Sequence, residues 1–245
     1  MKKLPVGLQL WSLRDDCARD FAGTMAAVAR MGYAGVELAG YGNLDAQGAK
    51  AAIDQAGLKV AGMHAPIQAL NADLHGLVSD ALLFGTRHLI CSWWPDTQFV
   101  SPEACQDIGE QLNEIGARVR AFGLQFSYHN HGGELRTVGG RTVLDWVLRA
   151  SEPRNVAAEV DVFWAQFAGV SPAALLRSLG ARCPLIHLKD AAEIGSGPVN
   201  FPEVFAAIDS VGAAEWLIVE VETYTLKPLD SVRQSLDQLR KWDRA

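Results

Sequence analysis

The sequence lacks several features by which whole classes of protein are recognised. Its 245 residues include only four cysteines, and no two of them form a Cys-x-x-Cys pair, so neither a disulfide framework nor a thiolate zinc site is indicated. No segment approaches the roughly 18 uninterrupted apolar residues of a membrane span. The net charge of −6 is the opposite of the basic surface typical of nucleic-acid binding. We therefore expect a cytoplasmic protein with no membrane or nucleic-acid partner.

The first residues imitate a signal peptide only weakly. Met1, Lys2 and Lys3 precede an apolar segment, but Gln9 interrupts it. The charged residues 14–16 follow without a small-residue cleavage site. We interpret this segment as the first strand.

Nucleotide-binding signatures are also missing, since no Gly-x-Gly-x-x-Gly follows an early strand and no Walker sequence occurs. What the chain has is a regular alternation of short apolar segments with longer segments of helical spacing. The predicted strands are 6–11, 35–38, 58–64, 86–91, a fifth from 124, 156–161, 184–188 and 216–221. The predicted helices are 21–31, 44–56, 67–84, 102–122, 142–150, 172–180, 202–209 and 228–242.

Eight strands alternating with eight helices, without a linker or low-complexity segment, predict a single (β/α)8 TIM barrel domain over residues 1–245. The rival fold is an open doubly wound sheet with a cofactor at its switch point, which the missing dinucleotide motif disfavours. In a TIM barrel the chemistry lies at the C-terminal ends of the strands.

The fifth strand ends in residues that a core has little use for. Tyr128-His129-Asn130-His131-Gly132-Gly133-Glu134 follows a short apolar segment. The glycines allow a sharp turn, while the histidines, the amide and Glu134 offer ligands, hydrogen-bond donors and a base. Because side chains alternate along a strand, His129 and His131 are expected on the same face. One could ligate a metal while the other binds substrate.

Three later strands end in a similar way, at Asp161, His187 and Glu220. Carboxylates that face each other inside a barrel need a cation or protons, and a mixed oxygen and imidazole set suits Mn, Zn, Co or Mg. Each residue alone would equally serve as a structural hydrogen-bonding group. As a set with a histidine of the fifth strand, they predict a divalent-metal site.

Other polar residues at the strand ends are candidates for catalysis and substrate binding. Lys189 shares the inward direction of His187 and could hold an oxyanion, a substrate hydroxyl or a carboxylate near the metal. Glu159, one layer deeper than Asp161, is expected in a buried salt bridge or hydrogen bond. Glu134 is the candidate general base or a solvated residue. The expected substrate-binding residues, each with a purely structural alternative, are His64, His131, Glu37 and the indoles of Trp11, Trp94 and Trp164, which suit the apolar faces of sugar rings.

With these residues in place, the chain resembles the xylose isomerase-like TIM barrels, in particular the sugar phosphate isomerase/epimerase group. The resemblance covers the whole chain, and it rests on Tyr128 to Glu134, Asp161 to Trp164, Leu185 to Asp190 and Trp216 to Glu220. It implies a divalent metal held by His129 (or His131), Asp161, His187 and Glu220. It also implies proton transfer at a carbon next to a carbonyl, with Glu134, Lys189 and Glu220 as catalytic residues.

The chain departs from two branches of this superfamily. Ketose epimerases usually have a glutamate where this chain has His129 and a histidine where it has Trp164, so a strict ketose 3-epimerase is not expected. The endonuclease IV branch needs a histidine-rich zinc cluster, which six histidines do not supply. The expected function is a sugar, keto-sugar or polyol isomerase or epimerase. A dehydratase on a keto-sugar or inosose and a non-catalytic sugar-binding barrel are the alternatives, and homo-oligomerisation is left open.

Overall fold

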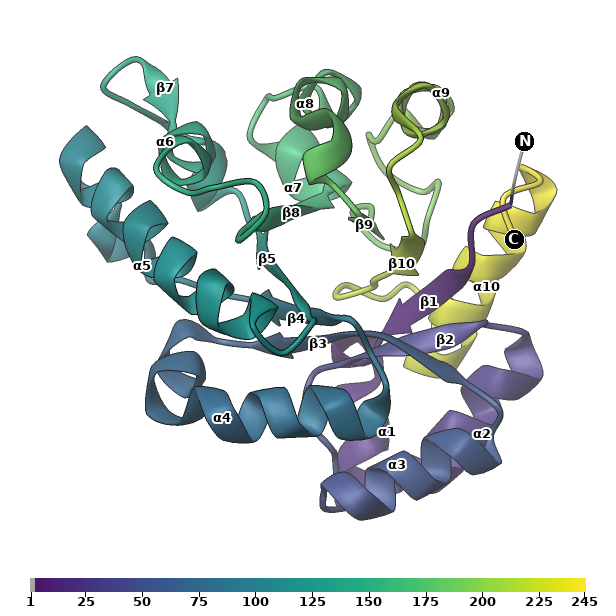
Figure 1. Cartoon of the computed structure of the whole chain (residues 1–245). Helices are drawn as coiled ribbons and strands as arrows, with labels where there is room; N and C mark the ends of the chain where they lie inside the picture. Colours follow the sequence, from purple (N-terminus) through teal and green to yellow (C-terminus); the bar gives the residue numbers. More distant parts are fainter. Residues whose placement is uncertain (1–2) are drawn as a thin grey trace.

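Eight parallel strands close into a barrel in the computed structural model, which describes residues 3–245 (Figure 1). The order around the barrel is β1-β10-β9-β8-β5-β4-β3-β2. The predicted (β/α)8 fold is confirmed, and the open sheet is excluded because β1 pairs with β2 on one side and with β10 on the other. The strands are β1 (Val6–Gln9), β2 (Gly35–Leu38), β3 (Lys59–Ala65), β4 (His88–Cys91), β5 (Gln125–His129), β8 (Ala157–Asp161), β9 (Leu185–Leu188) and β10 (Trp216–Val219). One domain over residues 1–245 stays a prediction, and Met1 and Lys2 lie outside the described residues.

Helices surround the barrel (Figure 1), and side chains at their first residues explain where several of them begin. The carboxylate of Asp45 and the hydroxyls of Ser101 and Ser171 each accept a hydrogen bond from a backbone N–H three residues later, which satisfies a donor left free by the first turn. The helices are α1 (Arg14–Arg19), α2 (Phe21–Met31), α3 (Ala46–Gln55), α4 (Ile67–Phe84), α5 (Pro102–Arg120), α6 (Val143–Arg149), α7 (Val162–Phe167), α8 (Pro172–Leu179), α9 (Phe201–Val211) and α10 (Pro228–Lys241).

The structure differs from the prediction mainly in short elements. β1 ends at Gln9 and not at residue 11, because the Gln9 side chain accepts from the Trp11 N–H and starts a 3-10 turn, Leu10–Leu13. The short helices α1 and α7 and a hairpin of β6 (Thr137–Val138) and β7 (Arg141–Thr142) were not predicted. These elements have two to six residues, too few for a periodic pattern to emerge.

The apolar core has two parts. The larger part lies between the strands and the helices, and the smaller one is a cluster of Ala61, Ile90, Leu185 and Ile218 against Trp216, which we call the apolar plug. Side chains two residues apart share a face of a strand, so Leu185 faces the same way as His187, and Ile218 the same way as Glu220. The plug therefore fills the barrel interior below the strand ends, and the inward positions above it are polar.

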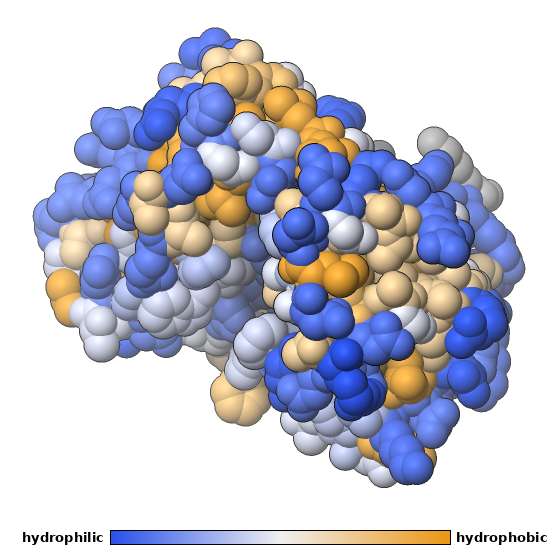
Figure 2. Space-filling model, turned by 90° about the horizontal axis from the view of Figure 1, so that it is seen from below, coloured by the Kyte–Doolittle hydropathy of each residue, from blue (hydrophilic) through white to orange (hydrophobic). Residues whose placement is uncertain are grey.

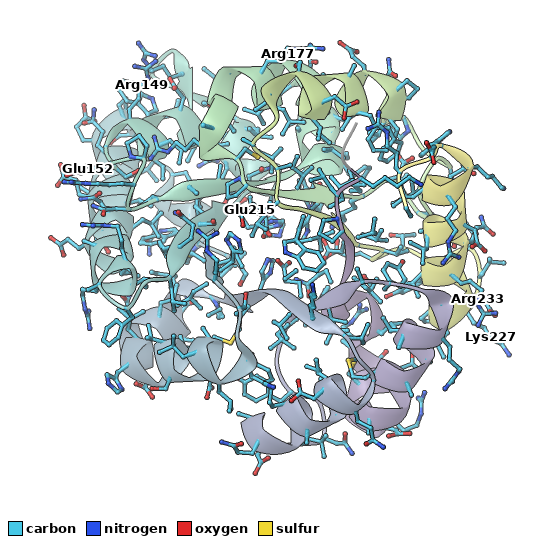
Figure 3. The ribbon with its side chains drawn as sticks, turned by 45° about the vertical axis from the view of Figure 1, so that its right-hand side comes forward. Arg149, Glu152, Arg177, Glu215, Lys227 and Arg233 are labelled. Carbon is cyan, nitrogen blue, oxygen red and sulfur yellow. The ribbon has the colours of Figure 1, made fainter. Side chains whose placement is uncertain are left out.

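The outer surface is ordinary for a barrel of this kind. Hydrophilic and hydrophobic residues are intermixed on the face shown in Figure 2, and Arg149, Arg177 and Arg233 point outward from α6, α8 and α10 (Figure 3). No helix within residues 3–245 has both the length and the apolar character needed to cross a membrane. The start of β1 and the end of α10 lie side by side, joined by an ion pair of 2.7 Å between Lys3 Nζ and Asp243 Oδ1.

Candidate metal and sugar site

Four potential metal ligands meet at the C-terminal ends of consecutive barrel strands. His129 ends β5, Asp161 ends β8, His187 lies on β9 and Glu220 directly follows β10. Asp161 lies opposite His187 in the β8–β9 ladder, and all four side chains are buried. One ligand atom from each lies within 4.8 Å of the ligand atoms of the other three.

One carboxylate oxygen of this group is buried and makes no hydrogen bond within residues 3–245. Asp161 Oδ1 accepts from the Trp164 N–H, but Asp161 Oδ2 has no hydrogen-bond partner there, whereas His129 Nδ1 lies 3.2 Å from Glu159 Oε2. Burial raises the pKa of Asp161 to about 6. A buried polar atom without a partner is costly, and a cation bound to Asp161 Oδ2 would remove that cost. Two imidazoles and two carboxylates are a donor set that divalent metals accept, so the residues fit such an ion.

A layer of carboxylates lies beneath the histidines. Glu37 Oε2 accepts from Gln9 Nε2 at 2.7 Å and from His187 Nε2 at 2.7 Å, and Glu159 Oε2 lies 2.6 Å from His64 Nε2. Burial opposes the charge on His64, but Glu37 and Glu159 raise the pKa of its imidazole to about 10. With its Nε2 directed at Glu37, His187 has Nδ1 left for the upper group, where it lies 3.4 Å from Glu220 Oε2.

The two lower carboxylates have different proton affinities. Burial raises the pKa of Glu159 to about 7, and the nearby charge of Glu37 adds to this effect. Burial acts on Glu37 in the same direction, but the positive charges of His64 and His187 prevail and hold the pKa of Glu37 well below its usual range. His64, His129, Glu159 and His187 form a second group with metal-ligand geometry. Because it shares His129 and His187 with the upper group, we regard the lower carboxylates as the outer support of one site.

Lys189 is buried among carboxylates. Its Nζ lies 2.6 Å from Glu222, 3.2 Å from Glu220 and 3.8 Å from Asp161, and 5.0 Å from the ring centroid of Trp164. Burial opposes the charge, but Glu220 and Asp161 raise the pKa of the ammonium above its usual value. Lys189 is therefore charged, and its neighbours already neutralise that charge.

A cavity of about 440 Å³ opens above these residues. Its walls combine indoles, imidazoles and carboxylates, which are Trp11 and Trp93, His64, His129 and His131, and Glu220 and Glu222. This mixture of flat apolar surfaces and hydrogen-bonding groups suits a hydroxylated ligand. His129 and His131 face the same cavity, but only His129 belongs to the two groups with ligand geometry among the described residues.

The structure does not bring Glu134 to this cavity. Its carboxylate accepts from the hydroxyl of Tyr128 and from the His131 N–H, both at 2.9 Å, and Tyr128 alternates with the inward-facing His129 and so points away from the barrel interior. Burial raises the pKa of Glu134 to about 7. The 3-10 turn Gly133–Leu135 returns the chain toward Tyr128, so Glu134 fixes the loop that carries His131 and does not face the ligand space.

Three of the expected substrate-binding residues are also displaced from the cavity wall. Trp94 is only 2% exposed, and its indole N–H donates to Gln98 Oε1, while its neighbour Trp93 lines the cavity instead. Glu37 lies in the lower layer and is fully buried. Trp164 contacts His131 and Lys189 but is not part of the wall. The expected positions of His64, His131 and Trp11 at the cavity agree with the structure.

Some residues of the site were not singled out from the sequence. Glu222 and Ser92 line the cavity, but neither is among the candidate residues named from the sequence. Gln9, whose amide joins Glu37 to the Trp11 backbone, looked like an interruption of an apolar strand. A glutamine in a buried strand could have been recognised as a candidate from the sequence, because its amide needs hydrogen-bond partners inside the protein.

Comparison with known proteins decides the family. Residues 25–242 match the family described as xylose isomerase-like TIM barrel. The chain belongs to this family. The membership expected from the strand-end motifs is thereby confirmed.

The individual proteins that this xylose isomerase-like barrel resembles are distant from it in sequence. Inosose dehydratase of Lacticaseibacillus casei is 23% identical over 157 residues, which cover 54% of this chain and 51% of that protein, so the chain matches about half the length of this curated relative. A sugar phosphate isomerase/epimerase structure from Parabacteroides distasonis has a TM-score of 0.88 at 24% identity, over 97% of this chain and 98% of that one. D-psicose 3-epimerase of Clostridium cellulolyticum H10 has a TM-score of 0.74 at 16% identity, over 97% and 99%. These structural likenesses show the shared fold.

Proposed function

We propose that the protein is a divalent-metal-dependent isomerase or epimerase that moves a proton at a carbon next to a carbonyl in a sugar, keto-sugar or polyol. The observation that carries this proposal is the convergence of four buried side chains, each with a ligand atom within 4.8 Å of the other three, at the base of a cavity. His129, Asp161, His187 and Glu220 would hold the metal. When bound, it would supply a Lewis acid that polarises the substrate oxygens.

The protein's own groups would position the substrate and move its proton. Glu220 lines the cavity, and burial opposes its charge, but Lys189 and His187 lower the pKa of its carboxyl, so it enters the reaction ionised. Its place in the wall, and not this lowered pKa, makes it the proposed proton acceptor. His64 and His131 lie in the cavity wall, within reach of substrate hydroxyls. Lys189 would keep Glu220 and Glu222 in place through its ammonium. This assignment replaces Glu134 as the proton acceptor.

A dehydratase is the second candidate, and two observations favour it. An epimerase must deliver a proton to the face of the carbon opposite the one it deprotonates, yet β5 offers His129 and not a second carboxylate. Elimination of a hydroxyl needs only the first proton transfer and an acid for the leaving group. The curated relative noted above is an inosose dehydratase.

The experiment that tests the proposal measures metal content and products together. We expect stoichiometric divalent metal in the purified protein and turnover that a chelator removes and metal restores. NMR in deuterated water over a panel of keto-sugars and inososes separates the classes, because deuterium at carbon without loss of water means isomerisation and loss of water means dehydration. Full turnover by protein shown to be metal-free would refute the proposal, and sugar binding without turnover would favour the non-catalytic alternative.

A further inference from the structure

Two indoles at the mouth of the cavity are not used by the chemistry proposed above. Trp11 is 46% exposed and Trp93 is 44% exposed, and both line the cavity. His187 and Asp161, by contrast, are fully buried. The cavity therefore has an inner part, where the ligand atoms converge, and an outer part with indole walls. Large aromatic side chains left half-exposed beside a cavity typically mark a binding surface.

The backbone that carries each indole is fixed in place. The Trp11 N–H donates to Gln9 Oε1 at 3.0 Å, and Arg14 donates to the Trp11 carbonyl at 3.0 Å while its guanidinium lies 5.0 Å from the centroid of the Trp11 ring. The Trp93 carbonyl accepts from the Ile67 N–H at 3.2 Å. Surfaces fixed before binding lose little entropy when a ligand arrives, so these indoles suit flat, rigid rings.

The buried cations at the cavity are already paired with carboxylates, so its outer part offers none of them to an anionic ring. Within the described chain, no arginine or lysine belongs to its lining, while Glu220 and Glu222 do. The imidazole of His64, which does line the cavity, lies 3.0 Å from Glu37 and 2.6 Å from Glu159. Lys189, behind the wall, is paired with Glu220 and Glu222. A phosphate or carboxylate on the ligand would meet negative charge without a partner, which is unfavourable at a partly buried site.

We infer that Trp11 and Trp93 form an outer subsite for a second, uncharged ring, so that the substrate is a neutral glycoside. Such a ligand has a reacting sugar in the inner part and a sugar or aromatic ring linked to it in the outer part. The cavity volume of about 440 Å³ lies within the range of roughly 300–1,000 Å³ typical of small-molecule sites. The inference rests on the proposed function for the inner part, but the outer subsite is testable by binding alone.

The test is calorimetric titration of the purified protein with four kinds of probe. These are phenyl glycosides of gluco-, galacto- and manno-configuration, cellobiose, the free monosaccharides, and glucose 6-phosphate. We expect at least one glycoside to bind about tenfold more tightly than its free sugar, which is the upper end of what one well-stacked aromatic pair contributes. Glucose 6-phosphate should bind more weakly than glucose.

Matched variants locate the effect. Trp11→Ala and Trp93→Ala should each weaken glycoside binding roughly three- to tenfold and leave free-sugar binding unchanged. Phe122→Ala removes an aromatic side chain that is 50% exposed and outside the cavity, so it should change neither. Equal binding of free sugars and glycosides, tightest binding of glucose 6-phosphate, binding of no probe, or unchanged affinity in both tryptophan variants would overturn the inference. Tryptophan-dependent glycoside binding without any turnover would count against the proposed function alone.

Discussion

The barrel interior contains two regions that the same strands build in opposite ways. The apolar plug fills its lower part with aliphatic side chains against Trp216. The upper part holds Glu37, Glu159, Asp161, Glu220 and Lys189, all of them buried. On β9, Leu185 belongs to the plug and His187, two residues later, belongs to the site. Burial of aliphatic groups stabilises the fold, whereas burial of several carboxylates costs free energy unless partners or a cation offset it. The plug therefore supplies stability, and the upper layer is shaped for binding.

The largest effect on activity is expected from a substitution in the upper layer. In the Asp161→Asn variant the amide oxygen can still accept from the Trp164 N–H, but the charge is lost at the oxygen that has no hydrogen-bond partner. We expect turnover to fall roughly a thousandfold, because one of the proposed metal ligands loses its charge. The melting temperature should not fall. Steady-state kinetics measure the turnover, and thermal unfolding measures the melting temperature. A destabilised variant with normal turnover would contradict the assignment of binding to the upper layer and stability to the plug.

The reverse result is expected in the plug. Leu185→Ala removes a fully buried side chain and should lower the free energy of unfolding by about 2–5 kcal/mol through lost burial and the cavity left behind. Denaturant unfolding measures this loss. Below the new melting temperature, kcat per folded molecule should be nearly unchanged. A loss of kcat comparable to that of Asp161→Asn would show that the plug also serves the site.

Glu134 lies outside both regions, and its ionisation is expected to make the stability of the fold depend on pH. Burial raises its pKa from the ordinary value of 4.5 to about 7 in the folded protein. The folded state therefore binds its proton more tightly than the unfolded state does, and the associated stability is present below pH 4.5 and lost as pH rises to about 7. Above pH 7, ionisation of Glu134 lowers the free energy of unfolding by about 3 kcal/mol.

The Glu134→Gln variant has no carboxyl to ionise at this position and can keep bonds to Tyr128 and the His131 N–H. We expect its stability to decline less than that of the unmodified protein between pH 5 and 7. Chemical denaturation across this range gives the difference between the two curves. Parallel curves would mean that Glu134 does not carry the effect.

The smallest effect is expected from the support beneath the site. Glu37→Gln should weaken metal binding about 10- to 100-fold, as is typical for a group that orients a metal-ligating histidine, because Glu37 orients His187. Glu215→Gln is the matched control. Glu215 pairs with His88 at 3.1 Å, and these residues lie where β10 and β4 begin, at the end of the barrel opposite the site. Competition with a metal-binding dye measures the metal affinity of both variants. Equal losses of affinity would show that Glu37 has no special role in metal binding.

The sequence was informative about the fold because its signals are local. Ser-Pro pairs begin α5 and α8, and Gly85 ends α4 with a left-handed φ of 69° that glycine adopts without strain. The inward direction of His129, Asp161, His187 and Glu220 also follows from strand alternation alone. These residues could be predicted because each one's place depends on a few neighbours.

The rest of the site depends on geometry beyond the strand ends, where alternation no longer applies. Trp93 and Trp94 are equivalent by composition, and only the path of the loop after β4 decides that Trp93 lines the cavity and Trp94 is buried. Glu134 is close to His131 in sequence, yet a single 3-10 turn directs it to Tyr128. A single turn of backbone therefore gives Glu134 a structural position in place of the catalytic one that the sequence predicts.

The pairing of β1 with β10 has a consequence for how the molecule is made. Val6 to Leu8 pair with Leu217 to Val219, so a growing chain keeps an unsatisfied edge on its first strand until almost all of it has been synthesised. Glu220 follows directly on the strand that closes this edge. A chain that stops before β10 therefore lacks both the strand that closes the ring and Glu220 of the proposed ligand set.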